Sequence, residues 1–193
     1  MTGLIILAAG ASSRLGHPKQ NLLYKGKTLL ERAVDAGIRS PCRPVVVVLG
    51  ANAEDITLSN ISNEADLVYN KHWQQGQSAS IKAGITELQK HPNITSAIMM
   101  LCDQPFVTSK LLSNMLQVRL QTQKPVVACS YNGTIGVPAL FNKGLFGHLL
   151  SLSGNHGAKQ LLQAQENDVA IVEFEEGSID IDTLADYERL LGK

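Results

Sequence analysis

The most informative stretch of this sequence lies near its start and reads Leu4-Ile5-Ile6-Leu7-Ala8-Ala9-Gly10-Ala11-Ser12-Ser13-Arg14-Leu15-Gly16-His17-Pro18-Lys19. Its apolar run predicts a buried strand over roughly Gly3 to Ala9. The small residues that follow place bare backbone N–H groups at the carboxyl edge of a sheet, where open α/β sheets bind their ligands. Arg14 and Lys19 add two cations at the same edge, as a polyphosphate requires. The stretch therefore predicts a nucleotide site.

Composition favours a single globular domain over residues 1–193. The chain is 44% hydrophobic, and its 17 basic and 17 acidic residues give a formal net charge of +0. Because no global field draws a polyanion or a membrane surface, we expect neither nucleic acid nor membrane as a partner. Cys42, Cys102 and Cys129 show no CxxC spacing, which is typical of a reducing compartment. No apolar run has the length of a signal peptide or membrane span, so we expect a cytoplasmic protein.

Strand-like and helix-like segments alternate along the chain, which predicts an α/β fold with helices on both faces of a sheet. Thr28 with Glu31, and Thr183 with Asp186, are predicted capping boxes. The pair Asn132-Gly133 predicts a hairpin turn. After the first strand, further strands are expected at 45–49, 67–69, 98–101, 126–128, 137–141 and 169–174. Helices are expected after residues 28, 108 and 183 and at 53–58, 78–88, 145–150 and 157–164.

The glycine loop differs from two common phosphate-binding motifs. Five residues separate Gly10 from Gly16 where the Walker motif has four, and His17-Pro18 follows instead of Lys-Ser. The GxGxxG dinucleotide pattern is also missing from the loop. A plain strand-to-helix turn is the alternative interpretation, since glycine and serine are ordinary turn residues.

The pattern Leu-Ala-Ala-Gly-x-Ser-x-Arg-Leu-Gly-x-x-Lys resembles the signature of the MobA-like NTP transferases, the nucleotidyltransferases of molybdenum cofactor synthesis. Leu15 stands where that family usually has Met. The resemblance implies a three-layer α/β/α, Rossmann-like fold with a mostly parallel mixed central sheet. It assigns phosphate binding and catalysis to Arg14 and Lys19. It also implies that the backbone of Leu7, Ala8, Ala9 and Gly10 holds the base.

Two carboxylate motifs point to a metal. Asp103 follows a predicted buried strand and precedes the rigid Pro105, although an Asx-turn or helix cap explains such an Asp equally well. Asp-Gln-Pro resembles the family's metal-binding DxP motif, and Asp180-Ile181-Asp182-Thr183 resembles the family's D-x-D-T ending. The resemblance implies Mg²⁺ held by Asp103, also a catalytic residue, and Asp182, with Asp180 in reserve. Carboxylate oxygens are ligands that suit Mg²⁺.

Three further segments resemble family motifs more loosely. The segment from Trp73 to Ser80 matches W-x-x-G-x-x-x-S, which implies nucleoside contacts for Gly76, Ser78 and Ser80, although a lone Trp is more often a packing anchor. Gly136-x-Pro138-x-x-Phe141 resembles a GxPxxF segment beside the acceptor pocket, or is simply the start of a strand.

A helix start at Gly157 is also expected to bind the acceptor, by donating N–H groups to an anion. There, residues 154–159 resemble GDxGAR, but Asn155 replaces the usual Asp and Lys159 the usual Arg. The change removes the carboxylate on which a charge-dependent role of this loop would rest.

The function implied by the resemblance is transfer of CMP from CTP to the phosphate of molybdopterin, with release of pyrophosphate. Ala9 favours CTP, because guanine-specific relatives usually carry Gly there and the methyl group crowds a purine. Alternatives are a guanylyltransferase, a sugar- or alcohol-phosphate nucleotidyltransferase, and a non-catalytic nucleotide-binding chaperone that inserts a cofactor into a molybdoenzyme partner.

Overall fold

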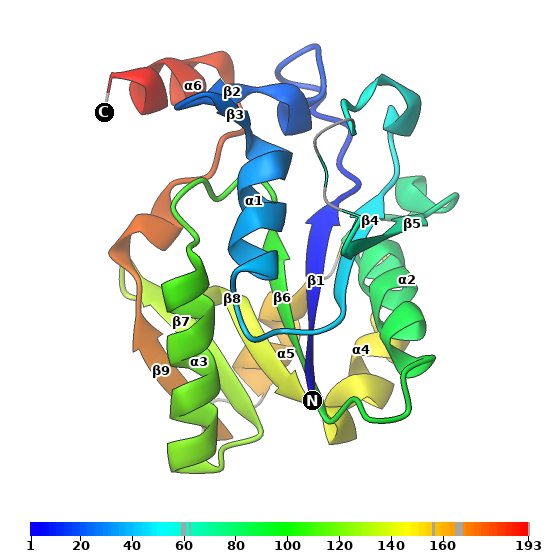
Figure 1. Cartoon of the computed structure of the whole chain (residues 1–193), viewed down its shortest axis with the longest axis vertical. Coiled ribbons are helices and arrows are strands. Elements are labelled where there is room, and N and C mark those ends of the chain that lie inside the picture. Colours follow the sequence, from blue (N-terminus) through cyan, green and yellow to red (C-terminus); the bar gives the residue numbers. More distant parts are fainter. Residues whose placement is uncertain (59–60, 62, 156, 165–167, 193) are drawn as a thin grey trace.

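The computed structural model describes residues 1–58, 61, 63–155, 157–164 and 168–192. Within these residues, seven strands form one sheet in the order β5-β4-β1-β6-β8-β7-β9 (Figure 1). β8 pairs antiparallel with both of its neighbours, and the other pairings in this sheet are parallel. The bounds are β1 Thr2–Ala8, β4 Val45–Leu49, β5 Ala65–Tyr69, β6 Ser96–Leu101, β7 Val126–Tyr131, β8 Thr134–Asn142 and β9 Val169–Glu173. The predicted mostly parallel mixed sheet is confirmed.

Helices cover both faces of this sheet, so the predicted three layers are confirmed. One face packs against α1 and α3, and the other against α2, α4 and α5. The helices are α1 Leu29–Ile38, α2 Gln77–Gln89, α3 Ser109–Thr122, α4 Phe146–Ser151, α5 Ala158–Ala164 and α6 Leu184–Leu191. Short 3-10 helices lie at Lys19–Asn21 (η1), Ala53–Asp55 (η2), Trp73–Gln75 (η3), Lys143–Leu145 (η4) and Glu175–Ser178 (η6).

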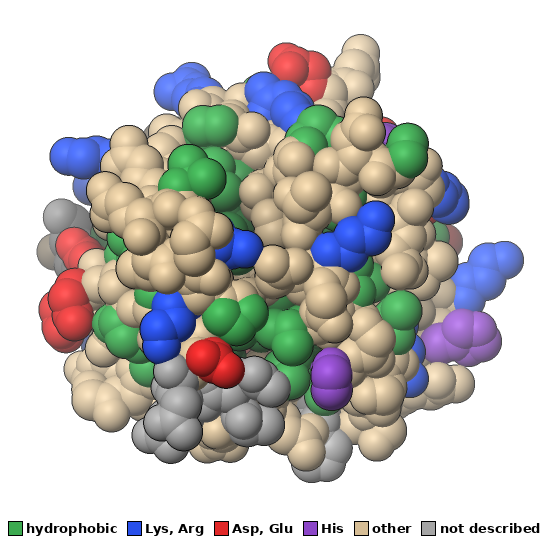
Figure 2. Space-filling view, turned by 90° about the horizontal axis from the view of Figure 1, so that it is seen from below, with side chains coloured by type: hydrophobic (Ala, Val, Ile, Leu, Met, Phe, Trp, Pro, Cys, Tyr) green, Lys and Arg blue, Asp and Glu red, His purple; other side chains and the backbone are tan. Residues whose placement is uncertain are grey.

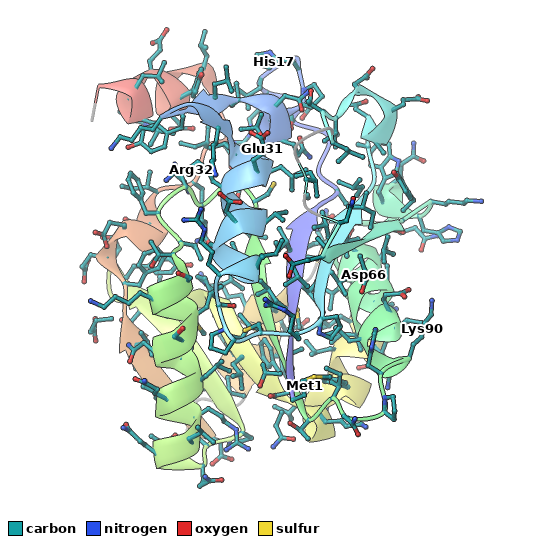
Figure 3. The ribbon with its side chains drawn as sticks, viewed as in Figure 1. Met1, His17, Glu31, Arg32, Asp66 and Lys90 are labelled. Carbon is teal, nitrogen blue, oxygen red and sulfur yellow. The ribbon has the colours of Figure 1, made fainter. Side chains whose placement is uncertain are left out.

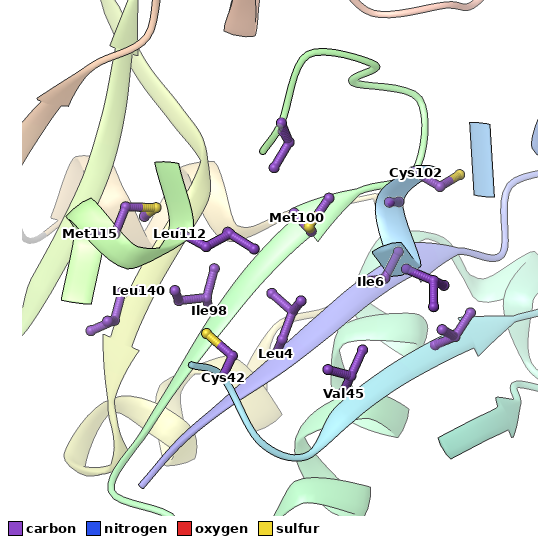
Figure 4. Packing of buried hydrophobic residues seen from close by; sticks show 14 of the residues in the cluster. Leu4, Ile6, Cys42, Val45, Ile98, Met100, Cys102, Leu112, Met115 and Leu140 are labelled. Carbon is purple, nitrogen blue, oxygen red and sulfur yellow. The ribbon is translucent and has the colours of Figure 1, made fainter. Parts of the chain in front are cut away.

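The two cores follow from strand alternation, because successive side chains of a strand point to opposite faces. Leu4 and Ile6 of β1 pack on the side of α1 and α3, whereas Ile5 packs on the side of α2. Figure 4 shows the first core, where Ile98 and Met100 of β6 lie near side chains of α3. The continuous apolar runs of β1 and β4 are therefore buried on both faces, as parallel strands require.

Local signals were accurate at the helix starts. Thr28 and Thr183 both form the predicted capping boxes with the residues three positions on, and the Thr108 side chain accepts from the N–H of Leu111. The helix expected over 53–58 is wrong, since only the 3-10 turn η2 forms after the left-handed residue Asn52.

A small hairpin was missed. β2 Leu23–Tyr24 pairs antiparallel with β3 Lys27–Thr28. Lys25 and Gly26 between them have φ of 50° and 80°, the left-handed pair of a tight hairpin turn. Figure 1 shows this hairpin beside α6, at the end of the molecule where the carboxyl ends of the parallel strands lie.

The strand order creates a switch point between β1 and β6. From β1 the chain moves to β4 and β5 on one side, and then returns to β6 on the other side of β1. The loop after β1 and the loop after β6 therefore leave the sheet side by side. Such a crevice is where open α/β sheets bind ligands.

The opposite end of the molecule is seen in Figure 2, where charged side chains are scattered instead of gathered in one patch. Met1 lies at that end, and His17 of the first loop lies at the other (Figure 3). Among the described residues, no helix combines the length and apolar character needed to cross a membrane.

Candidate functional site

The loop after β1 is closed by its own hydrogen bonds. Ser12 has a φ of 52°, and its carbonyl accepts from the N–H groups of Leu15 and Gly16 at 2.9 and 3.2 Å. Its hydroxyl also accepts from the N–H of Lys19 at 3.0 Å. These bonds turn the chain back on itself and return Lys19 to the end of β1. The local sequence thus determines the shape of this loop through its turn geometry.

Four charged side chains meet above the ends of β1 and β6. Lys19 Nζ donates to Asp103 Oδ2 and, at 2.8 Å, to Asp182 Oδ1. Arg14 Nη2 donates to Asp182 Oδ2 at 2.8 Å. The side chain of Lys19 is 13% exposed and that of Asp103 10%, whereas that of Arg14 is 66% exposed. The structure therefore brings together Arg14, Lys19, Asp103 and Asp182, which the sequence assigned to one site.

The charges in this cluster depend on one another. Burial disfavours the Lys19 ammonium, but Asp103 and Asp182 outweigh it and raise the pKa of Lys19 above its ordinary value. The hydrogen bond from Lys19 lowers the pKa of Asp182. Burial, and then the charges of Asp103 and Asp182, raise the pKa of Asp180 to about 6. Asp180 therefore lies close to the cluster in an environment less favourable to its charge than that of Asp182.

A cavity of about 370 Å³ opens beside this cluster. Its walls come from the loop after β1, from the start of α2 with η3, and from the end of β6. The predicted site residues in its lining are Leu7, Ala8, Ala9, Gly10, Lys19, Gly76, Ser80 and Asp103. Trp73, Gln77 and Asn155 line it as well. Its size suits a small ligand.

The two predicted serines of α2 differ in position. Ser80 lines the cavity, and its hydroxyl accepts from Asn70 Nδ2 at 3.0 Å. Ser78 lines a neighbouring cavity instead, and its N–H donates to the carbonyl of Gly154 at 3.3 Å. Since a helix turns by about 100° per residue, these two serines cannot face the same cavity equally.

The three predicted acceptor residues do not line this cavity. Gly136 lies against the Tyr131 hydroxyl, and Pro138 follows a cis peptide bond. Between them, the carbonyl of Val137 accepts from Gln104 Nε2 at 3.2 Å, so this segment is tied to the residue after Asp103.

Gly157 lies elsewhere, beside the side chain of Gln77 at the start of α2. It comes just before α5, whose described part is Ala158–Ala164. His156 of the same motif lies outside the described residues.

The donor set at Asp103 fits a divalent cation. Asp103 Oδ1 is buried and has no hydrogen-bond partner among the described residues, although Oδ2 is held by Lys19. In the same residues, no group of three or more His, Cys, Asp and Glu side chains is arranged to hold a metal ion. Mg²⁺ does not require such a group, because it commonly binds through only one or two carboxylates, with water and substrate phosphates as its other ligands.

Sequence reasoning missed several residues around the site. Gln20 and Gln104 are almost fully buried and bond to backbone carbonyls on either side of the cluster. Asn155, named from the sequence only as a departure from the GDxGAR pattern, lies in the wall of the cavity, against Gly76. The position of Gln20 and Gln104 directly after Lys19 and Asp103 is the one signal in the sequence that singles them out.

Known proteins resemble this chain along nearly its whole length. Nicotine blue oxidoreductase of Paenarthrobacter nicotinovorans is 30% identical, with 97% of this chain and 95% of that protein covered. Molybdenum cofactor cytidylyltransferase of Escherichia coli K12 is 25% identical, with 95% and 92% covered.

Solved structures also resemble this chain along its length. Rv0371c of Mycobacterium tuberculosis H37Rv superposes with a TM-score of 0.86 at 29% identity, covering 100% of this chain and 97% of that one. Its complex with manganese gives a TM-score of 0.78 at 26% identity, covering 100% and 98%. The model of the MobA-like NTP transferase domain matches residues 4–169, and the chain belongs to that family of nucleotidyltransferases.

Proposed function

We propose that this protein transfers CMP from CTP to the phosphate of molybdopterin and releases pyrophosphate. The observation that carries the proposal is the Lys19 ammonium, which bridges Asp103 and Asp182 at a cavity on the switch point of the sheet. A cation and two carboxylates at that edge suit a metal-bound triphosphate. The 25% identity to a molybdenum cofactor cytidylyltransferase supports the acceptor.

In this proposal, an oxygen of the acceptor phosphate attacks the α-phosphorus of CTP. A new P–O bond forms there, the bond to the β-phosphate oxygen breaks, and pyrophosphate leaves. Because the acceptor phosphate is already ionised, the chain supplies no nucleophile and needs no strong base. Lys19 and Arg14 bind the phosphates and stabilise the departing pyrophosphate, so catalysis is mainly positioning and electrostatics.

Mg²⁺ would be held by Asp103 and Asp182 and, when bound, neutralises charge on the phosphate oxygens. Lys19 pairs with both carboxylates. Its ammonium therefore balances part of their charge and also lies in the wall of the cavity, where it would bind phosphate oxygens. The manganese complex of a 26% identical protein supports the use of a divalent cation.

The base assignment rests on Ala9. Its methyl group points toward Gly50, where an added Cβ would lie 2.8 Å from it, and Ala9 also forms part of the cavity wall. Gly at position 9 would leave this wall less tightly packed, so we expect Ala9 to disfavour the larger purine. Molybdopterin and a molybdoenzyme that receives the product are the partners that this function implies.

The direct test incubates the protein with CTP, Mg²⁺ and molybdopterin and identifies the product by mass spectrometry. We expect a cytidylylated product and equimolar pyrophosphate, with slower reaction from GTP. Pyrophosphate from GTP alone would instead support the guanylyl alternative, and release only with a sugar or alcohol phosphate would support that class of acceptor. Binding of CTP without pyrophosphate release would support a cofactor-insertion chaperone.

The identity to nicotine blue oxidoreductase supports a second candidate, a redox reaction of an organic substrate in the same cavity. Its assay follows oxidation of NADH or NADPH in the presence of an oxidised organic acceptor. Consumption of the reduced nucleotide without pyrophosphate release would favour this candidate over nucleotidyl transfer.

A further inference from the structure

Two buried glutamines adjoin the site, and each makes the same kind of contact with a different part of the backbone. Gln20 is 0% exposed and Gln104 3% exposed, and each directly follows a charged site residue. Each donates from its Nε2 atom to two backbone carbonyls. Since a carbonyl only accepts, these contacts fix which way each amide faces. Each Oε1 is buried and accepts no hydrogen bond from the described residues.

Gln20 sets the peptide planes of the loop after β1. Its Nε2 donates to the carbonyls of Ala8 at 2.6 Å and Gly10 at 3.3 Å. In a planar trans peptide the next N–H points away from the carbonyl, so the N–H groups of Ala9 and Ala11 point away from Gln20. Among the described residues these two N–H groups take no part in backbone hydrogen bonds. Both residues line the cavity, so the arrangement leaves donors ready for a ligand.

Gln104 helps to hold in place the segment that leads to Asp182, the second carboxylate of the site. Its Nε2 donates to the carbonyl of Val137 at 3.2 Å and to that of Gly177 at 3.0 Å. The carbonyl of Asp103 accepts from the N–H of Ile181 at 3.1 Å. Residues 103 and 104 thus hold residues 177–181 at two points. This double attachment sets the position of Asp182 relative to Asp103.

A purely stabilising role explains these glutamines poorly. A buried acceptor without a partner is unfavourable, and such groups are uncommon in folded proteins. We propose that both are positioning residues: Gln20 presets the N–H donors for the nucleotide, and Gln104 presets the spacing of the two metal-binding carboxylates. This inference rests on the proposed function, because it assumes a nucleoside triphosphate and a divalent cation as ligands.

The test separates the two ligands by calorimetry of CTP binding, once with EDTA and once with Mn²⁺. For Gln20→Leu we expect metal-free CTP affinity to fall about tenfold or more, because two preset donors are lost, while the gain in affinity on adding Mn²⁺ is kept. For Gln104→Leu we expect metal-free affinity to stay within about twofold of the unsubstituted protein, while the gain from Mn²⁺ falls about fivefold or more. Titration of Mn²⁺ itself, followed by electron paramagnetic resonance, gives a readout independent of activity.

The matched control is Asn21→Ala. Asn21 lies in the same short helix as Gln20, and its amide bonds to the backbone of Asp55 and Thr57, away from the loop. We expect this control to leave both affinities unchanged. Thermal melting checks the fold of each variant. Where a Leu variant is unfolded, Gln20→Asn and Gln104→Asn keep the amide and shorten its reach by one methylene.

Opposite defects in the two variants support the inference. Equal loss of both affinities in both variants, or normal binding in both, overturns it. Failure of the unsubstituted protein to bind CTP under either condition overturns the proposed function, and this inference with it. That outcome differs from the others because it is seen before any substitution is made.

Discussion

The two halves of the site are built differently. The loop half, residues 7–20, is closed by local contacts such as that between Ser12 and Lys19, 7 residues apart, and that between Ala8 and Gln20, 12 apart. The acidic half joins Lys19 to Asp103 and to Asp182, which lie 84 and 163 residues away. The first half is therefore a property of one turn, whereas the second exists only after the sheet has formed. Substitutions in one half should therefore affect the protein differently from substitutions in the other half.

The largest effect is expected at Asp103, in the acidic half. Asp103→Ala removes the buried carboxylate and should lower the rate of pyrophosphate release by about 10³-fold, a magnitude typical of losing one strong electrostatic group in an active site. Circular dichroism should show an intact fold. Asp66→Ala, on the exposed strand β5, is the control and should leave the rate unchanged. Near-normal turnover of Asp103→Ala would remove this residue from the mechanism.

The two cations provide the next comparison. Lys19→Met should weaken CTP binding roughly 100-fold, because a mostly buried charged hydrogen bond is lost. Arg14→Met should weaken it only about threefold, since an exposed ion pair contributes little. Calorimetric titration measures both, with exposed Lys90→Met as the control. Equal losses of CTP affinity in the Lys19 and Arg14 variants would mean that burial does not determine how much each side chain contributes to CTP binding.

A smaller effect is expected on base choice. Ala9→Gly removes a methyl group from the cavity wall and should reduce the preference for CTP over GTP by about tenfold, as expected for one small apolar group in a pocket. Competition binding with the two nucleotides gives the ratio. If the unsubstituted protein already prefers GTP, the cytidylyl assignment is wrong.

The smallest effect is expected at two helix caps, one near each half of the site. Thr28→Ala and Thr183→Ala each remove a capping box and should lower the free energy of unfolding by about 1 kcal/mol in urea. Because Thr183 directly follows Asp182, its variant should also weaken the response to Mn²⁺, whereas the Thr28 variant should not. Identical metal responses would show that the α6 cap does not hold Asp182 in place.

Much of the fold was predictable because its signals are local. The run Val45–Leu49 predicted β4 with its observed bounds, and the Thr-x-x-Glu and Thr-x-x-Asp patterns predicted two helix starts. The short hairpin at Lys25-Gly26 was missed because strands of two residues show no alternation. The helix expected over 53–58 was wrong because six residues are too few to form a stable helix by themselves, and the chain is extended again at Ile56.

The candidate site shows the same division. Arg14, Lys19, Asp103 and Asp182 were found from motifs, and the structure brings them together. Which serine of α2 faces the cavity depends on the rotation of that helix, and the sequence pattern treated Ser78 and Ser80 alike.

By itself, the sequence determined β1 and the conformation of the glycine loop that follows it, because both depend on turn geometry and on contacts between residues within about twelve positions of each other. Only the tertiary structure decided the strand order that places β6 beside β1, and hence the meeting of Lys19 with two distant carboxylates. The same packing buried Gln20 and Gln104 against carbonyls that no spacing rule connects to them. The physical reason is that a buried polar group finds its partners in space, and the topology of the sheet determines which partners those are.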